Sequence, residues 1–110
     1  MAEYRLIVTV PALEDVNGIR EDVNGIRAYI AGKLDNPSAA QKFSDKVFSS
    51  ASSLALLPKR YRVRRKDRKG REIRYMPSDN FIIMYCVDDA VHTVSVIRVA
   101  YAGRDLDTLI

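Results

Sequence analysis

Hydrophobic and polar positions in the first third of the chain predict a strand followed by a helix. The run YRLIVTV at residues 4–10 is rich in β-branched residues and precedes a proline, as at the end of a strand. Pro11 suits a first helical turn, and Gly32 with Lys33 suits the end of a helix. Apolar residues recur at spacings of three and four, as on one face of a helix, at Val16, Ile19, Val23, Ile26 and Ile30.

The next segment predicts a second helix that pairs with the first. Asn36 is a candidate N-cap, and Pro37 stands where proline favours the first helical turn. The helix should end near Leu57 and Pro58. Its apolar face consists of Ala40, Phe43, Val47, Ala51 and Leu54. Because the short connection GKLDN joins two helices with one apolar stripe each, we expect an antiparallel helical hairpin packed on another surface.

That surface is predicted to be a sheet. REIRYM (71–76), FIIMYCV (81–87) and HTVSVIRVAY (92–101) have strand composition and are separated by the turns PSDN and VDDA. The middle run is apolar on both faces, so we expect it to be central. The order β-α-α-β-β-β predicts an α+β fold, with an antiparallel sheet of about four strands and the N-terminal helical hairpin across one face. The tail is too short to predict a firm helix, although three residues suit a cap on the core: Leu106, Leu109 and Ile110.

Length and composition limit the class of protein. The 110 residues predict one small domain, spanning 1–110. No apolar run approaches the roughly 18 residues of a membrane span, and the acidic start lacks a cleavage-type site, so we expect a cytoplasmic protein. Cys86 is the only cysteine and lies in an apolar run, so we interpret it as a core residue. The sequence indicates no metal site and no cofactor.

Charge is concentrated in one segment. Residues 59–71, KRYRVRRKDRKGR, hold 9 of the 18 basic residues and one acid, whereas the rest, with 9 basic and 13 acidic residues, carries −4. This asymmetry favours a polyanionic partner, either nucleic acid or an acidic protein segment, although a merely solvated hairpin is the alternative interpretation. The candidate contact residues are Arg60, Arg62, Arg64, Arg65, Lys66, Arg68, Lys69 and Arg71.

The predicted first helix contains one heptad written twice. EDVNGIR occupies residues 14–20 and again 21–27 without a substitution. Seven residues turn a helix to within about 20° of two full turns, so the apolar stripe continues in phase. We therefore favour one long helix, about 10 Å longer than its partner, whose exposed apolar turns suit a homodimer contact. The alternative is that one copy loops out, because each copy carries an Asn-Gly pair that readily forms a turn.

Four motifs in this order resemble a known family. A-x-x-D-V-x-x-I follows the first strand, and L-x-x-L-P-x-R-Y lies between the second helix and the sheet. I-R-Y-M-x-x-x-N-F-I-I-M-Y-x-V-D-D and V-x-V-I-R-V-A-Y-A-G-R-D then complete the pattern. Over nearly its whole length the chain resembles the RelE/ParE toxins of bacterial and archaeal toxin–antitoxin pairs. Deleting one heptad copy restores the spacing that this family pattern expects.

The resemblance implies a partner and two possible targets. The partner is an antitoxin whose acidic C-terminal segment wraps the toxin, and operator DNA is bound only through that antitoxin. Family members act on the ribosome as mRNA endonucleases or, in the ParE branch linked to plasmid stabilisation, poison DNA gyrase. A third hypothesis, prompted by the duplicated heptad, is a copy that has lost toxicity and survives as an antitoxin-binding or repressing partner.

Candidate nuclease residues decide between the branches. Nuclease members usually carry an arginine just after the aromatic residue that begins the central strand, where this chain has Ile82, and a basic residue at the end of the last strand, where it has Ala100 and Ala102. The set that remains lacks an obvious general base. This departure favours the ParE branch. If the protein is a nuclease, the candidate catalytic residues are Arg74, Tyr85, Arg98, Tyr101 and Arg104.

Structural interpretations compete for several of these residues. Tyr85 alternates with apolar neighbours, so core packing is its favoured role. Arg98 interrupts an apolar strand and requires a partner, so an ion pair with an acid such as Asp105 or Asp107 competes with a functional role. His92, the only histidine, is interpreted as an exposed strand residue rather than a general base.

Overall fold

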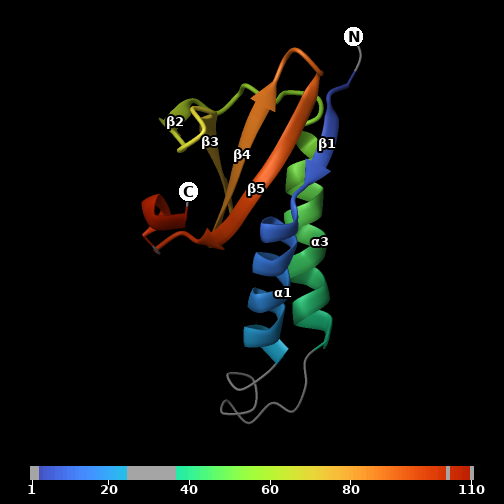
Figure 1. Ribbon diagram of the computed structural model, residues 1–110. Helices are drawn as coiled ribbons and strands as arrows, with labels where there is room; N and C mark the ends of the chain where they lie inside the picture. The colour runs from blue at the N-terminus through green and yellow to red at the C-terminus, as the bar shows by residue number, and fades with distance from the viewer. Residues whose placement is uncertain (1–2, 25–36, 104, 110) are drawn as a thin grey trace.

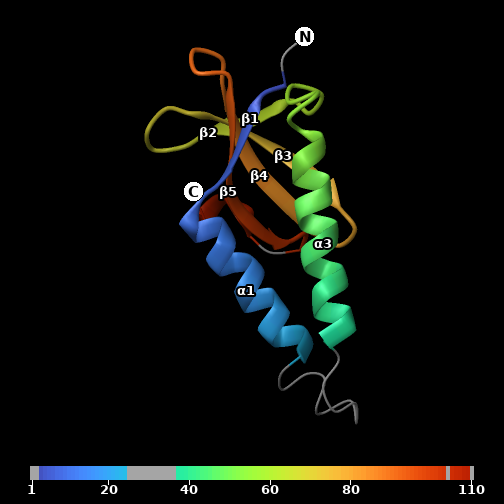
Figure 2. The same ribbon diagram turned by 90° about the vertical axis from the view of Figure 1, so that its right-hand side faces the viewer.

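The computed structural model describes residues 3–24, 37–103 and 105–109 and has an α+β fold. A five-stranded sheet is covered on one face by two antiparallel helices, α1 (Val10–Asn24) and α3 (Pro37–Ser53) (Figures 1 and 2). The strands lie in the order β1-β5-β4-β3-β2. The predicted α+β architecture, with a helical hairpin across one face of a largely antiparallel sheet, is therefore confirmed.

The sheet has one strand more than the sequence predicted. β3 (Glu72–Ser78), β4 (Phe81–Asp88) and β5 (Thr93–Tyr101) form the expected antiparallel series, with β4 in the centre. The added strand is β2 (Val63–Lys66), inside the basic segment, which pairs antiparallel with β3 at the edge of the sheet. Strand composition did not reveal it, because three of its four residues are cationic.

The first strand runs parallel to its neighbour. β1 (Arg5–Val8) pairs with the start of β5, from Arg5 opposite Thr93 to Val8 opposite Val96. This direction was not predicted, because β1 and β5 are the first and last strands of the chain and the two helices separate β1 from the others. The other described strand pairs are antiparallel.

A threonine side chain ends β1 and begins α1. The Thr9 amide donates to the Val96 carbonyl at 3.0 Å, which extends the ladder by one residue. Its hydroxyl donates to the same carbonyl at 2.9 Å and accepts from the Ala12 amide at 3.4 Å, the contact of an N-cap. The helix therefore begins at Val10, inside the predicted strand, and Pro11 lies in its first turn as predicted.

Two apolar clusters pack on the two faces of the sheet. The larger lies under the helices, where the predicted stripe residues Val16, Val47 and Leu54 are at most 2 % exposed. The smaller lies on the opposite face, around Ile73, Met84, Cys86, Ile97 and Ala100. Burial raises the pKa of the Cys86 thiol, consistent with its predicted core position.

The C-terminal tail covers part of the smaller cluster. It forms the short 3₁₀ helix η1 (Leu106–Leu109), where the sequence predicted no firm helix. Leu106 and Leu109 pack against the cluster, as predicted, and Ile110 lies outside the described residues. In Figure 1, η1 lies on the far side of the sheet from α3. The tail therefore extends the fold to a third layer at this point.

Helix α1 crosses the junction between the two heptads. It contains the whole first copy and the first four residues of the second, so the junction at residues 20–21 is helical. Gly18 lies inside the helix, with no atom close to the position of an added Cβ. The far ends of α1 and α3 extend past the end of the sheet (Figures 1 and 2). Whether the helix continues through residues 25–32, as favoured, or loops out lies outside the described residues.

Two further classes of feature are missing from the described part of the chain. None of its helices has the length and apolar character needed to cross a membrane. Its His, Cys, Asp and Glu side chains form no group of three that suits a metal ion.

Candidate functional site

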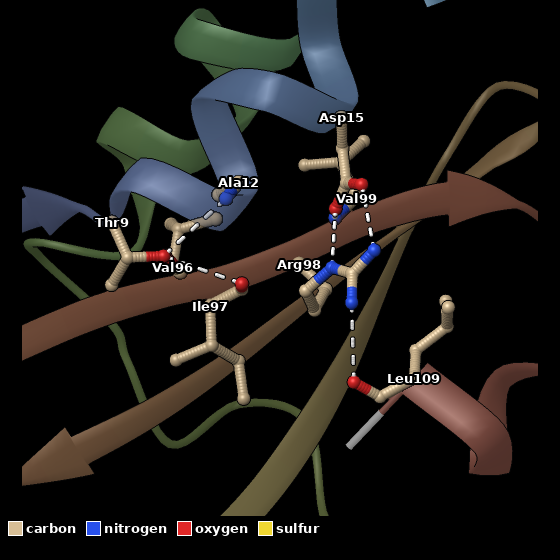
Figure 3. A network of polar contacts seen from close by, with 8 residues as sticks. All are labelled: Thr9, Ala12, Asp15, Val96, Ile97, Arg98, Val99 and Leu109. Atoms are coloured by element: carbon tan, nitrogen blue, oxygen red, sulfur yellow. Dashed lines mark hydrogen bonds and ion pairs between the residues drawn. The ribbon is translucent and has the colours of Figure 1, made fainter. Parts of the chain in front are cut away.

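Arg98 is held by an acid on the first helix. Its Nε and Nη2 donate to the two carboxylate oxygens of Asp15 at 2.7 and 2.8 Å (Figure 3). One of those oxygens also accepts the Val99 amide at 2.9 Å, and Arg98 Nη1 donates to the Leu109 carbonyl at 3.2 Å. The hydrogen bonds to Asp15 raise the pKa of the Arg98 guanidinium, although partial desolvation opposes them. One ion pair thus joins α1, β5 and η1.

The ion pair of Arg98 was expected, but its partner was not. The sequence suggested an acid of the tail, and the structure instead uses Asp15, 83 residues away in the chain. In the sequence, Asp15 was noted only as the acid of the motif A-x-x-D-V-x-x-I and of the first heptad. Two features of the sequence could have indicated this pair: a charged residue, Arg98, within an apolar strand, and an acid, Asp15, beside the apolar stripe of the first helix. The Arg98 side chain is 25 % exposed and that of Asp15 12 %.

Tyr85 and Arg74 are neighbours, and the side chain of each donates a hydrogen bond to a backbone carbonyl. They stand opposite each other on β4 and β3. Tyr85 is fully buried, and its hydroxyl donates to the Pro58 carbonyl at 2.6 Å. Burial raises the pKa of the Tyr85 phenol, although the charges of Arg74 and Arg60 oppose this. Arg74 Nη1 donates to the Tyr61 carbonyl. The predicted packing role of Tyr85 is therefore confirmed.

Tyr101 lies far from Tyr85. Its strand position is opposite Phe81, four residues along β4 from Tyr85, a separation of about 13 Å in an extended strand. The Tyr101 ring packs on Phe81 with centroids 4.9 Å apart, and Phe81 packs on Phe43 at 4.5 Å. Arg104 lies outside the described residues. Arg74 and Tyr85 therefore stand opposite each other, whereas Tyr101 lies at the other end of β4.

His92 lies in the turn before β5 rather than in the strand. It is exposed, as predicted, and its φ of 50° is in the left-handed region. Its ring stacks on Tyr4 with centroids 3.8 Å apart. Beside it, Asp89 accepts from Tyr4 Oη at 2.7 Å and from Lys59 Nζ at 2.6 Å. The hydrogen bond with Asp89 raises the pKa of Lys59, so this cation at the start of the basic segment is bound within the protein.

The basic segment, residues 59–71, includes β2 and the turn that leads to β3 at the edge of the sheet. We call this segment the basic hairpin. Its one acid, Asp67, organises the tip: the carboxylate accepts the amides of Lys69 and Arg71 at 3.0 and 2.9 Å and Arg71 Nε at 2.7 Å. Desolvation raises the pKa of Asp67, but these hydrogen bonds outweigh it and the net shift is downward. Gly70, with φ of 81°, completes the turn.

This geometry separates the single acid of the hairpin from solvent. The Asp67 side chain is only 6 % exposed, whereas nearly all of the cationic residues are exposed; only Arg65 is half-buried. The basic hairpin therefore presents positive charge outward. The predicted contact residues lie on β2 and on the segments just before and after it: Arg60, Arg62, Arg64, Arg65, Lys66, Arg68, Lys69 and Arg71.

A cavity of about 400 Å³ lies between the hairpin tip and the start of α1. Pro11, Ile97 and Leu109 supply apolar lining. Arg68 and Lys69 supply positive charge at its edge. The other lining residues are Thr9, Asp67, Arg71 and Arg98. Such a site suits a chain segment that carries an apolar side chain beside carboxylates.

The fold and this cationic surface together define a class: a small basic protein with a helical hairpin on one face of a sheet, as in toxins of toxin–antitoxin pairs. The family profile described as the ParE toxin of the type II toxin–antitoxin system parDE matches residues 17–106. The chain therefore belongs to the RelE/ParE family of type II toxin–antitoxin toxins, as its motifs predicted.

A solved structure supports the fold independently. The chain is similar to a chain in the crystal structure of the toxin–antitoxin complex RelBE2 from Mycobacterium tuberculosis, with a TM-score of 0.58. The similarity covers 94 % of this chain and 97 % of that one at 16 % sequence identity, and at this identity it bears on the fold alone. No curated protein matches the chain.

Proposed function

We propose that this toxin stops growth by binding DNA gyrase in the cytoplasm, without cleaving RNA itself. The observation that carries the proposal is the placement of Arg98. Both terminal nitrogens of its guanidinium and its Nε have partners within the protein, two of the three donors on Asp15. A nuclease of this family would need such an arginine to stabilise the crowded phosphate of the transition state. Here the same group instead holds α1 and the tail to the sheet.

The position of the other candidate nuclease groups supports the same conclusion. Tyr85 is buried and its proton is directed at a carbonyl oxygen, so it is badly placed for proton transfer to a nucleotide. Tyr101 lies about 13 Å along the sheet from it. A binding mechanism requires no such convergence. The contact surface we propose for gyrase is the basic hairpin together with the C-terminal face beside it.

We also propose that the toxin is neutralised by a cognate antitoxin with an acidic, partly apolar C-terminal segment. The cavity beside the hairpin tip combines the apolar residues Ile97 and Leu109 with Arg68 and Lys69 at its edge. An ordered segment would bury apolar side chains there and pair its carboxylates with the cations. Its affinity should therefore fall as salt rises, and a salt-insensitive affinity would contradict the electrostatic part.

A gyrase assay tests the main proposal. Purified toxin should block supercoiling of relaxed plasmid or trap DNA cleaved by gyrase, and induction should stop growth. Unaffected gyrase at stoichiometric excess, together with growth arrest in the same strain, would refute the proposal. Toeprinting should then show whether ribosomal A sites are cut, and cuts that disappear in a folded Tyr101→Phe variant would assign the nuclease activity. Harmless expression with retained antitoxin binding would instead identify a non-toxic partner.

A further inference from the structure

The strand β2 places a row of exposed cations along the edge of the sheet. Arg62, just before the strand, and Arg64 and Lys66 within it are exposed. Each strand of duplex DNA carries one negative charge per nucleotide. A row of exposed cations therefore suits such a polyanion.

A tyrosine ring lies beside this row. The pairing of β2 with β3 shifts register between Val63 and Arg65, so Arg64 is the extra residue. Its guanidinium lies over the ring of Tyr75, 5.3 Å from the centroid. Tyr75 also packs against the smaller apolar cluster, which fixes the ring from behind. A hollow of about 450 Å³ is lined by Arg64, Arg65, Lys66 and Tyr75.

We propose that this hollow, the β2 cation site (Arg64, Arg65, Lys66 and Tyr75), binds the phosphodiester backbone of duplex DNA directly. The cations would pair with phosphate oxygens, and the tyrosine hydroxyl and ring edge would contact the sugar-phosphate chain. Such contacts position a protein on DNA without reading base sequence. This interaction is separate from binding of operator DNA through the antitoxin, and it does not require gyrase.

The surroundings favour DNA over an acidic peptide. Within residues 59–78, all of which the structure describes, no large apolar side chain is exposed. A peptide needs apolar anchors to bind with useful affinity, whereas DNA binding is driven largely by release of counterions from phosphates. The cavity at the hairpin tip is a different place, where Pro11, Ile97 and Leu109 add apolar lining to charged residues. The two sides of the basic hairpin therefore suit different ligands.

The experiment measures binding of the full chain to a fluorescein-labelled 30-base-pair DNA duplex by anisotropy from about 50 to 200 mM salt. If three or four phosphates are contacted, the logarithm of the association constant should fall with the logarithm of salt with a slope of about −3. The double variant Arg64→Gln/Lys66→Gln should reduce that slope by about two. A duplex of the same length with a scrambled base sequence should bind with the same affinity and the same slope.

The matched control removes the same charge elsewhere. Lys42 and Lys46 are exposed on α3, which covers the opposite face of the sheet, and Lys42→Gln/Lys46→Gln should leave the slope unchanged. Circular dichroism and thermal melting confirm that both double variants are folded. Absence of binding at 50 mM salt would overturn the proposal, as would an equal loss in the control.

Two competitors distinguish the other sources of negative charge. Polyglutamate of equal charge should displace the duplex poorly, and equal displacement would reassign the site to acidic protein. An RNA duplex of the same sequence should bind no more tightly than DNA, and tighter binding would overturn the DNA assignment. Because these measurements contain no gyrase, their outcome is independent of the supercoiling assay.

Discussion

The carboxylate of Asp15 makes two contacts with β5. It accepts hydrogen bonds from the guanidinium of Arg98 and from the backbone amide of Val99. Arg98 in turn reaches the Leu109 carbonyl, so the helix, the sheet and the C-terminal tail meet at one ion pair. A charged residue in an otherwise apolar strand thereby acquires partners for its donors. The same contacts make the pair a structural element whose loss can be measured.

We predict that Asp15→Asn lowers the free energy of unfolding by about 2 kcal/mol, between the values typical of exposed and of buried pairs, because both side chains are partly buried. Urea denaturation provides the measurement. A double-mutant cycle with Arg98→Gln should show coupling, because Arg98 left alone loses its charged partner.

The repeated heptad supplies a matched control for that variant. Asp22 holds the same position in the second copy of the heptad as Asp15 holds in the first. The structure pairs Arg98 with Asp15. Asp22→Asn should therefore change stability by no more than about 0.5 kcal/mol. Destabilisation by Asp22→Asn in place of Asp15→Asn would mean that the second heptad takes the place of the first in solution. The fully buried Ala12 opposes such a shift, because Ile19 would then occupy its position.

Tyr85→Phe should destabilise the protein by about 1 kcal/mol at neutral pH, because the Pro58 carbonyl loses its hydrogen bond. Growth arrest should persist, since the hydroxyl has a structural role. The two properties are measured by denaturation and by growth after induction. Loss of arrest in a variant that remains folded would restore the tyrosine to the functional site.

The same tyrosine predicts a loss of stability at alkaline pH. Its pKa is raised above the ordinary value near 10, so the native state holds the proton more tightly than the unfolded state. The contribution is complete below about pH 10 and is lost as the pH rises through the native pKa. Wild type and Tyr85→Phe should therefore converge in stability above pH 10. Parallel curves across this range would contradict the shift.

Asp67→Asn should loosen the hairpin tip while leaving the centre of the sheet intact. The backbone amides of Lys69 and Arg71 lose a charged acceptor, so their hydrogen exchange should become faster, whereas amides of β4 should be unchanged. Because the pKa of Asp67 is lowered, wild type should show the same loosening only as pH falls below about 4. Unchanged exchange in the variant would refute the role of Asp67.

Deletion of residues 14–20 and deletion of 21–27 give one and the same sequence, and we predict that this shorter chain folds with stability within about 1 kcal/mol of the original. The remaining copy supplies the same acid and the same apolar residues in phase. Light scattering at high concentration should show a dimer for the full chain and a monomer for the shorter one. A monomeric full chain would refute dimerisation through the extended helix.

The elements best predicted from sequence were those with strong periodicity. The apolar stripe on α3 and the central position of β4 could be predicted because the spacing of apolar residues is visible in the local sequence. β2 was missed because its solvent-facing edge is built of arginine and lysine, which mask the strand pattern. The start of α1 was displaced because Thr9 extends the strand with its amide and caps the helix with its hydroxyl.

Contacts between distant segments were the hardest part to predict. The need of Arg98 for a partner could be inferred from its neighbours, but selecting Asp15 requires knowing that α1 packs against β5. The concentration of charge in residues 59–71 was visible at once. The orientation of that charge was not, because it depends on Asp67 turning inward at the hairpin tip.

The bond from Val99 to Asp15 has a consequence for assembly. β1 ends at Val8, opposite Val96, so among the described residues no strand lies beside the second half of β5 on that side. The amide of Val99, which an incoming strand would need as a donor, already donates to the Asp15 carboxylate. Helix α1 also lies against this part of β5. A partner peptide that binds as an extra strand is thereby steered to the outer edges of β1 and β2, and β2 admits only strands that tolerate its row of cations.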